Sequence, residues 1–340
     1  MSKRNVQACK FGAIKLSSFE PAWGLSNGHC QTIYPRYFVK HPDVKTAKER
    51  IATTDGDFLD LAWSIPRSKQ SPKSVAVIFH GLQGSVDSHY AKHAIHALCE
   101  ENYIVVLMHF RGCSQAPNMT PRAYHSGEVE DPIMILNHVK QRYPHLPICA
   151  VGFSLGGNML MNLLAEHSDR VSLSTAIAIS SPLNLSACAR KMDTGFSRVY
   201  QAHLIKSMQA NLIAKMKNVD MRGALGLNQE SIRRLNTFYA FDDEITAPLH
   251  GFTGAQDYYQ RCSALPKLSK IHTPTLIIHA KDDPFMNHEV VPTREQLSDS
   301  VAYEVSEHGG HVGFLSGSIV KPKLWLNQRI VGHFNYIIEG

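Results

Sequence analysis

Short apolar runs alternate with amphipathic stretches along most of this chain. Strand-like runs rich in apolar residues cover residues 74–79, 103–110, 148–153, 174–180, 273–280 and 301–308. Between several of them the apolar residues follow a helical period, as in HYAKHAIHALCEEN after the first run. Strands that are apolar on both faces are typical of a parallel sheet covered by helices on both sides. The pattern therefore predicts an α/β fold with a mostly parallel central sheet.

Two local signals refine this prediction. The turn DGD at 55–57 lies in an alternating stretch, RIATTDGDFLDLAWS, and predicts a β-hairpin. Ser126 precedes three acidic residues, Glu128, Glu130 and Asp131. This order predicts a helix that is N-capped by Ser126 and carries the acids in its first turn, where the helix dipole favours negative charge.

The strand–helix rhythm is interrupted over residues 183–262. One helical face in this stretch is entirely apolar and consists of Leu204, Ile205, Met208, Leu212, Ile213 and Met216. We interpret 183–262 as a helical lid insertion that divides an α/β core into residues 50–182 and 263–340. Residues 1–49 precede this core, and within them the stretch 16–37 mixes aromatic residues with proline and glycine and shows no clean period. We expect them to form an irregular arm packed on the body, with no element of its own.

The composition is that of an ordinary globular protein. The chain has 340 residues, of which 44% are hydrophobic and 19% charged, so it can form one large domain or two modest ones and is not disordered. No apolar run approaches the roughly 18 residues of a membrane-spanning helix, and no secretory signal is present. Seven cysteines without a CxxC pair are typical of reduced thiols. We therefore expect a cytoplasmic protein, whose oligomeric state the sequence leaves open.

The net charge of +6 is unevenly distributed. Residues 1–50 and 183–240 each contain nine Lys or Arg against three Asp or Glu, so the remainder is acidic. Such segments could favour peripheral contact with lipid, or an anionic substrate group that meets Arg190, Lys191 and Arg198, although solvated basic helix faces are commoner. A nucleotide-binding role is disfavoured, because GFSLGG lacks both the dinucleotide-binding glycine pattern and a P-loop lysine. No nucleic-acid partner is expected.

A serine interrupts the core where an apolar run meets the following helix. The local sequence at 152–156 is GFSLG, and glycines two residues away on each side remove Cβ atoms that would clash in a tight turn. This G-x-S-x-G pattern between strand and helix predicts a nucleophile elbow, with the Ser154 hydroxyl exposed above the carboxyl end of the sheet. The plain alternative is a tight turn whose serine has no chemical role.

A serine hydroxyl needs an adjacent base to act as a nucleophile at neutral pH. On a fold of this kind the acid and the histidine follow the serine in chain order, each in a loop after a later strand. Two loops supply such residues: Asp282 and Asp283 follow one strand, and His308 and His311 follow the next. We predict Asp283 as the acid, because a proline turn follows it, and His311 as the base, because two preceding glycines let the loop reach the serine.

The stretch FHGLQGS ends the first buried strand, where a second oxyanion donor belongs. The N–H groups of Leu82 and Leu155 are the candidate donors for the oxyanion of an acyl-transfer reaction. His80, in the same stretch, is interpreted as holding the loop in shape.

Together these motifs resemble the α/β-hydrolase superfamily. The resemblance is carried by FHGLQGS, MHFRGCS, YHSGEVED, GFSLGGN, HAKDDPFMNH and EHGGHVGF, in this order along the chain. More narrowly, the chain looks like the YheT-like branch of bacterial esterases, which is related to eukaryotic α/β-hydrolase-domain lipases. The resemblance implies Ser154 as nucleophile, Asp283 as acid partner and His311 as base of a serine hydrolase. Its substrates would be small-molecule carboxylic esters with short-to-medium or lipid-like acyl groups, and no metal or organic cofactor would be needed.

Other interpretations stay open. Thioesterases and acyltransferases use the same triad, and a chain can keep the fold as a non-catalytic binding protein. His89, His93 and His96 share one face of a predicted helix at a spacing that can bind a metal, although ordinary helix histidines are commoner. Cys113 follows a strand, but no base is identifiable beside it, so we interpret it as a buried or half-buried thiol.

Overall fold

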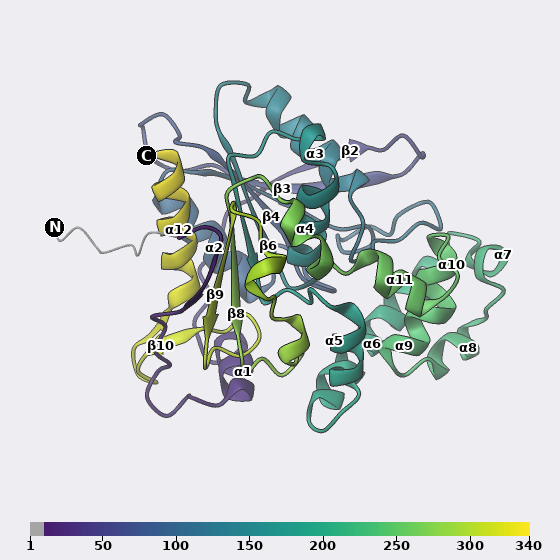
Figure 1. The fold of residues 1–340 in the computed structure, drawn as a ribbon. Helices are drawn as coiled ribbons and strands as arrows, with labels where there is room; N and C mark the ends of the chain where they lie inside the picture. Colours follow the sequence, from purple (N-terminus) through teal and green to yellow (C-terminus); the bar gives the residue numbers. More distant parts are fainter. Residues whose placement is uncertain (1–9) are drawn as a thin grey trace.

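The computed structural model describes residues 10–340, so the first nine residues of the predicted arm lie outside the described part of the chain. A nine-stranded sheet runs through the molecule in the order β1-β9-β8-β7-β6-β4-β5-β3-β2 (Figure 1). Its strands are β1 (Ala13–Leu16), β2 (Ala47–Ala52), β3 (Phe58–Ser64), β4 (Val75–Phe79), β5 (Ile104–Met108), β6 (Ile148–Phe153), β7 (Thr175–Ile179), β8 (Thr275–Ala280) and β9 (Val301–Ser306). All pairings are parallel except those of β2 with β3 and of β3 with β5. The predicted α/β architecture and the β2–β3 hairpin are confirmed.

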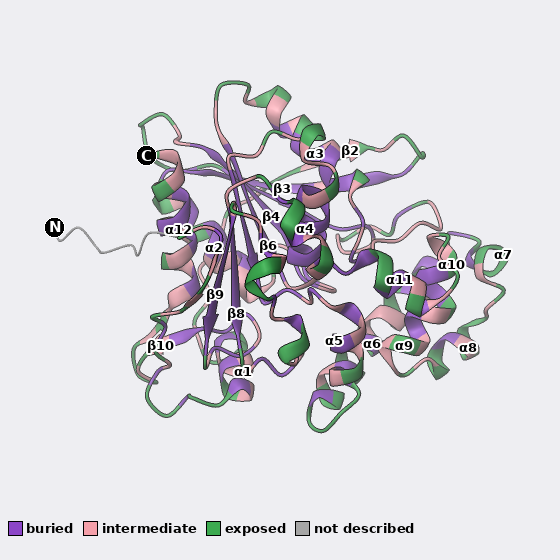
Figure 2. Cartoon of the chain, viewed as in Figure 1, coloured by how far each residue is buried: buried purple, intermediate pink, exposed green. Residues whose placement is uncertain are grey.

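Helices cover both faces of the sheet. The helices are α1 (Gly28–Tyr37), α2 (His89–Glu100), α3 (Glu130–Arg142), α4 (Leu155–Glu166), α5 (Leu185–Met192), α6 (Ser197–Lys215), α7 (Met221–Leu225), α8 (Gln229–Arg234), α9 (Phe238–Phe241), α10 (Ala247–Leu249), α11 (Ala255–Cys262) and α12 (Trp325–Ile338). Apolar residues of α3 and α4 pack on one face of the sheet, and those of α2 and α12 pack on the other. The strands between these layers are buried on both sides (Figure 2), which explains why they are apolar at consecutive positions.

Residues 183–262 leave the sheet after β7 and return before β8, and helices α5 to α11 gather beside it (Figure 1). Part of this insertion has an apolar cluster of its own, consisting of Ile205, Leu212, Val219, Met221, Ile232, Phe241 and Ile245. One turn of π-helix, Asp242–Thr246, joins α9 to α10. The segment is helical as predicted, and its action as a lid stays a prediction.

The N-terminal arm is more regular than predicted. Residues of β1 pair in parallel with β9, and α1 follows. Asn27 caps α1 by accepting hydrogen bonds from the N–H groups of His29 and Cys30. Gln31, fully buried in the helix, donates to the carbonyls of Leu25 and Leu315. The helix is held by these polar contacts, and it therefore shows no apolar period in the sequence.

Ser126 is not the N-cap of α3, so that prediction is wrong. The helix begins at Glu130, and Oε1 of Glu128 accepts from the N–H groups of Glu130 and Asp131 in place of the serine. Ser126 is buried, and its hydroxyl accepts from Nδ2 of Asn158 at 2.8 Å. The hydroxyl of Ser126 therefore contacts a residue of α4 and does not cap α3.

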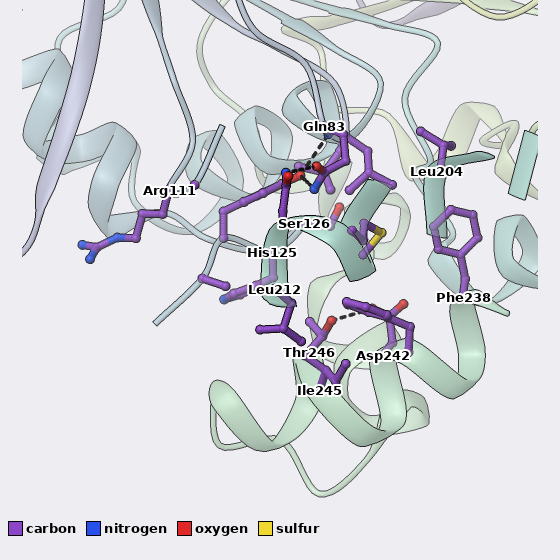
Figure 3. Close-up of a pocket in the computed structure, with 18 of the residues that line it drawn as sticks. Gln83, Arg111, His125, Ser126, Leu204, Leu212, Phe238, Asp242, Ile245 and Thr246 are labelled. Atoms are coloured by element: carbon purple, nitrogen blue, oxygen red, sulfur yellow. Dashed lines mark hydrogen bonds between the residues drawn. The ribbon is translucent and has the colours of Figure 1, made fainter. Parts of the chain in front are cut away.

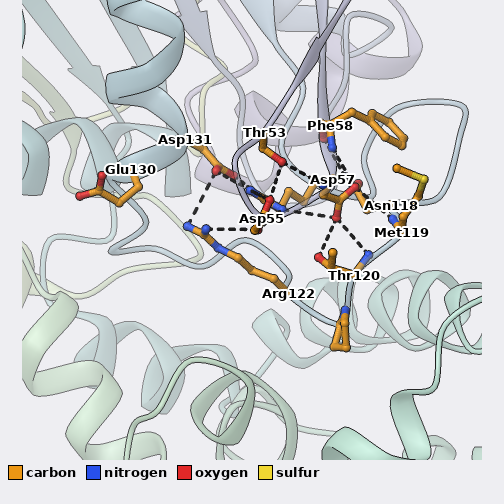
Figure 4. A network of polar contacts seen from close by, with 12 residues as sticks. Thr53, Asp55, Asp57, Phe58, Asn118, Met119, Thr120, Arg122, Glu130 and Asp131 are labelled. Atoms are coloured by element: carbon orange, nitrogen blue, oxygen red, sulfur yellow. Dashed lines mark hydrogen bonds and ion pairs between the residues drawn. The ribbon is translucent and has the colours of Figure 1, made fainter.

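A buried ion network ties the β2–β3 turn to α3 (Figure 4). Arg111 reaches Asp131 at 2.7 Å, Asp55 at 2.9 Å and Asp57 at 3.3 Å. Burial alone would raise the pKa of Asp57, but hydrogen bonds from Met119, Asn118 and neighbouring groups outweigh it and lower the pKa to about 2. The carboxylate is therefore ionised and pins the loop that follows β5 against the hairpin.

Small elements complete the fold. Short 3-10 turns cover Ser168–Arg170, Leu265–Lys270, His288–Val290 and Arg294–Gln296, and β10 (Leu315–Gly317) pairs with β11 (Pro322–Leu324). The six described cysteines are not in disulfides. No helix within residues 10–340 combines the length and apolar character needed to cross a bilayer.

Candidate active site

Ser154 sits on a strained bend between β6 and α4. Its φ is 51°, in the left-handed region, and its N–H donates to the carbonyl of Ile179 on the neighbouring strand at 2.8 Å. A Cβ at Gly152 would lie 2.4 Å from the Gly156 carbonyl oxygen, and one at Gly156 would lie 2.5 Å from the His80 carbonyl oxygen. Any larger residue at either position would force the backbone apart, so both glycines are required by the bend.

The structure brings Ser154, His311 and Asp283 together in one chain of hydrogen bonds. Nε2 of His311 lies 3.0 Å from Oγ of Ser154, and Nδ1 lies 2.8 Å from Oδ2 of Asp283. Because an ionised carboxylate can only accept, the proton of the neutral imidazole is on Nδ1. Nε2 is then free to accept the proton of the serine hydroxyl.

The alternative acid and base do not enter this chain. Asp282 accepts instead from the N–H of Gly310 at 2.8 Å and faces the half-buried His308 at 3.5 Å. Burial raises the pKa of Asp282, whereas hydrogen bonding to Gly310 opposes the rise. Asp282 thus supports the loop that carries His311, and His308 lies on the outer side of that loop.

The His311 loop is held by residues that the sequence analysis did not single out. The N–H of His311 donates to Oγ1 of Thr32 on α1 at 2.9 Å, and the N–H of Val312 donates to Oγ of Ser180 at 3.0 Å. Val312 has a φ of 59°, which is strained for a β-branched residue. The N-terminal arm is therefore part of the scaffold of the site. The arm contacts the site through polar side chains such as Thr32, and such contacts produce no apolar period in the sequence.

Leu82 and Leu155 border the same cavity as Ser154. Leu155 is the first residue of α4, where unpaired N–H groups and the helix dipole favour negative charge. His80 is fully buried, its Nδ1 lies 2.7 Å from the Gly81 carbonyl and its Nε2 accepts from the N–H of Phe110. Burial lowers its pKa to about 3, so the ring is neutral and ties two loops together.

A cavity of about 350 Å³ is lined by Ser154 and by residues of the insertion. Figure 3 shows part of this lining, including Leu204, Phe238 and Asp242 of the insertion. The apolar lining of the cavity includes Leu204, Met208, Leu212, Phe238 and Ile245. Leu204, Met208 and Leu212 come from the apolar helical face that the sequence predicts. Within the described chain, Ile213, Met216 and the predicted anion-binding residues Arg190, Lys191 and Arg198 are not part of the lining. Arg190 pairs with Glu289 at 2.7 Å instead.

Asp242 adds a buried carboxyl group to the cavity wall. It accepts from the hydroxyl groups of Thr246 at 2.7 Å and Tyr259 at 2.8 Å. Burial raises its pKa to about 6, and the two hydrogen bonds oppose the rise. The insertion therefore contributes a titratable group that the sequence analysis did not identify, since nothing in DDEIT marks Asp242 as the buried one.

The predicted histidine face of α2 does not converge on a metal site. His93 instead contacts His41, with Nε2 of His93 lying 3.2 Å from Nδ1 of His41. Among the described residues, the potential metal ligands that lie within 4.8 Å of one another are His125, Glu128 and His250.

That cluster is poorly suited to a cation. The N–H of Gly127 donates to Nδ1 of His125, which leaves the ring proton on the Nε2 side that faces Glu128. Arg122 already pairs with Glu128 at 2.8 Å. The arrangement favours hydrogen bonding over metal coordination.

Cys113 has the environment of an inert thiol. Burial raises its pKa to about 12, and a hydrogen bond to Tyr124 opposes the rise. The thiolate form is therefore scarce near neutral pH.

Comparisons with known proteins agree with this architecture. The sequence profile of the alpha/beta hydrolase fold matches residues 76–318. A protein named as an esterase, YheT of Escherichia coli (strain K12), is 45% identical over 95% of both chains. The human protein named phospholipase ABHD3 is 27% identical over 93% of this chain and 78% of its own. An esterase of Pyrococcus furiosus superposes with a TM-score of 0.54 at 15% identity, covering 87% of this chain and 92% of its own. The chain belongs to the α/β hydrolase fold family.

Proposed function

We propose that the protein hydrolyses carboxylic esters through an acyl-enzyme on Ser154. The observation that carries this proposal is the hydrogen-bond chain from Ser154 through His311 to Asp283, which opens onto an apolar cavity. The names of the relatives, esterase and phospholipase, support ester hydrolysis in general. A serine, a base and a carboxylate in this order of contact form the machinery of acyl transfer.

In the first step His311 takes the proton of Ser154 as Oγ attacks the ester carbonyl carbon. Asp283 keeps the imidazole in the required tautomer and stabilises its positive charge. The N–H groups of Leu82 and Leu155 are the proposed donors to the oxyanion. His311 then gives its proton to the leaving alcohol, and the same residue activates the water that hydrolyses the acyl-enzyme.

The cavity indicates the kind of acyl group. Its lining on the insertion side is mostly aliphatic and aromatic, with a few polar residues such as Lys215 and Asp242, and its volume of about 350 Å³ lies at the small end of the range for ligand sites. We therefore propose uncharged acyl chains of short to medium length. The insertion would act as a lid by forming the outer wall of this cavity.

The test is the replacement Ser154→Ala, assayed on a series of p-nitrophenyl acyl esters. We expect kcat to fall by roughly 10⁴-fold or more, because Ser154 is the hydroxyl that contacts Nε2 of His311. Ser186→Ala, which removes a hydroxyl outside the cavity lining, is the matched control and should retain full activity.

Labelling with a fluorophosphonate probe should modify Ser154 in the wild type and no residue in the Ser154→Ala variant. Unchanged turnover in a folded Ser154→Ala variant, or labelling elsewhere, would refute the proposal.

A further inference from the structure

Phe285 stacks face to face on the ring of His311. The ring centroids are 3.9 Å apart and the planes differ by 6°. The N–H of Phe285 donates to Oδ1 of Asp283 at 2.8 Å, while Oδ2 of the same carboxylate meets His311. One short turn after β8 therefore holds the imidazole at its edge through Asp283 and at its face through Phe285.

The phenyl ring is itself braced from two other parts of the chain. Tyr200 on α6 packs on Phe285 with ring centroids 5.1 Å apart. The hydroxyl of Tyr200 lies 3.0 Å from Nδ1 of His29 on α1, and those two rings are stacked within 13° of parallel. The stack thus runs from His311 through Phe285 to both the insertion and the arm.

We propose that Phe285 is a positioning residue that also stabilises the charged form of His311 during the reaction. The face of an aromatic ring carries negative potential and attracts a cation lying over it. His311 is neutral before the reaction and positive once it has taken the Ser154 proton. An interaction that is stronger with the charged ring lowers the barrier to acyl transfer. This inference rests on the proposed function.

Several other titratable groups surround His311, and most of them are neutral. Those that interact with the His311–Asp283 pair or lie on the braces include Asp282, His29, His89, Cys188, Tyr200, His279 and Tyr303. Burial raises the pKa of Cys188 and of Tyr303, so both are neutral. Burial lowers the pKa of His89 to about 3 and that of His279 to about 4, so both rings are neutral. Burial raises the pKa of Tyr200 to about 12, and it too is neutral. Asp283 is the carboxylate in direct contact with the imidazole.

The first experiment compares Phe285→Leu and Phe285→Trp with the wild type. Phe285→Leu keeps an apolar side chain but removes the aromatic face, and we expect kcat to fall about tenfold with little change in KM. Phe285→Trp should recover most of the loss, because indole attracts a cation more strongly. Phe11→Leu is the matched control, since it removes a phenyl ring packed on another histidine, His333, and should leave kcat unchanged. Full kcat in Phe285→Leu would overturn the proposal.

A second experiment keeps the shape of the side chain and changes only the charge distribution of the ring. Stepwise fluorination of phenylalanine at position 285 weakens the negative face, so kcat should fall with each step. NMR titration of the His311 ring should show protonation at progressively lower pH in the same series. The titration needs no substrate, so it tests Phe285 even if ester turnover proves absent and the proposed function fails. An unchanged titration across the series would refute the stabilising role.

Discussion

The carboxyl edge of the sheet and the helical insertion form two walls of one cavity, but they hold their side chains in different ways. On the sheet side, backbone geometry fixes the site: Ser154 and Val312 have positive φ, and Gly152 and Gly156 approach neighbouring carbonyl oxygens too closely for any side chain. On the other side, lining residues such as Leu204 and those of α9 project from helices that pack around their own apolar cluster.

The two walls therefore differ in what substitutions they accept. The sheet edge needs particular residue types at particular positions, because strained backbone and directional hydrogen bonds fix the positions of Ser154 and His311. The insertion needs suitable size and polarity, and volume-conserving exchanges among its apolar residues typically cost less than about 1.5 kcal/mol. Reaction chemistry is expected to be robust to changes in the insertion, while substrate preference should follow them.

The largest effect should be a difference in kcat between substitutions of two neighbouring acids at the sheet edge, Asp283 and Asp282. Asp283→Asn presents an amide to Nδ1 of His311 and favours the tautomer that carries its proton on Nε2, which can no longer accept from Ser154. We expect kcat to fall roughly 10⁴-fold. Asp282→Asn can still accept from Gly310 and should stay within a few-fold of the wild type. Steady-state kinetics on one p-nitrophenyl ester checks both, and equal losses would mean that the acid is shared or misassigned.

The second largest effect should be a difference in stability between glycine substitutions at the bend of Ser154 and in the insertion. Gly152→Ala places a Cβ against a carbonyl oxygen and should destabilise the fold by about 3 kcal/mol or more. Gly226→Ala, in the insertion, meets a positive φ of 69° but open space, so it should cost about 1 kcal/mol. Thermal melting of the two variants measures the contrast. Similar losses at both positions would show that the insertion is as tightly constrained as the elbow.

The smallest effect concerns the titratable group of the insertion. Burial raises the pKa of Asp242 from 3.8 to about 6, so the folded chain holds this proton more tightly than the unfolded chain. Its stabilising contribution is complete below about pH 4 and is lost as the pH rises through about 6, a change of up to roughly 3 kcal/mol.

Asp242→Asn lacks this titration and is its control. The Tm of the wild type relative to Asp242→Asn should therefore fall as the pH rises from about 4 to about 7. A constant difference in Tm over that range would contradict the raised pKa.

Several features could be predicted because they leave a pattern in neighbouring residues. Consecutive apolar positions marked the strands, and glycines at 152 and 156 marked the bend at Ser154. The chain order of Ser154, Asp283 and His311, each after a strand of the sheet, predicted which residues meet, although in the structure His311 lies between the other two. The arm was misjudged because α1 is held by buried polar contacts of Gln31, and Ser126 was misjudged because its partner, Asn158, lies far away in the sequence.

The sequence by itself determined the α/β rhythm and the tight bend, because both arise from residues close together in the chain. It also narrowed the acid to two residues and the base to two. Only the tertiary structure decided which acid meets which imidazole, which residues of the insertion face the cavity, and that Phe285 covers His311. Those outcomes depend on the approach of segments distant in sequence, and the distances and burial that set them exist only once the chain has folded.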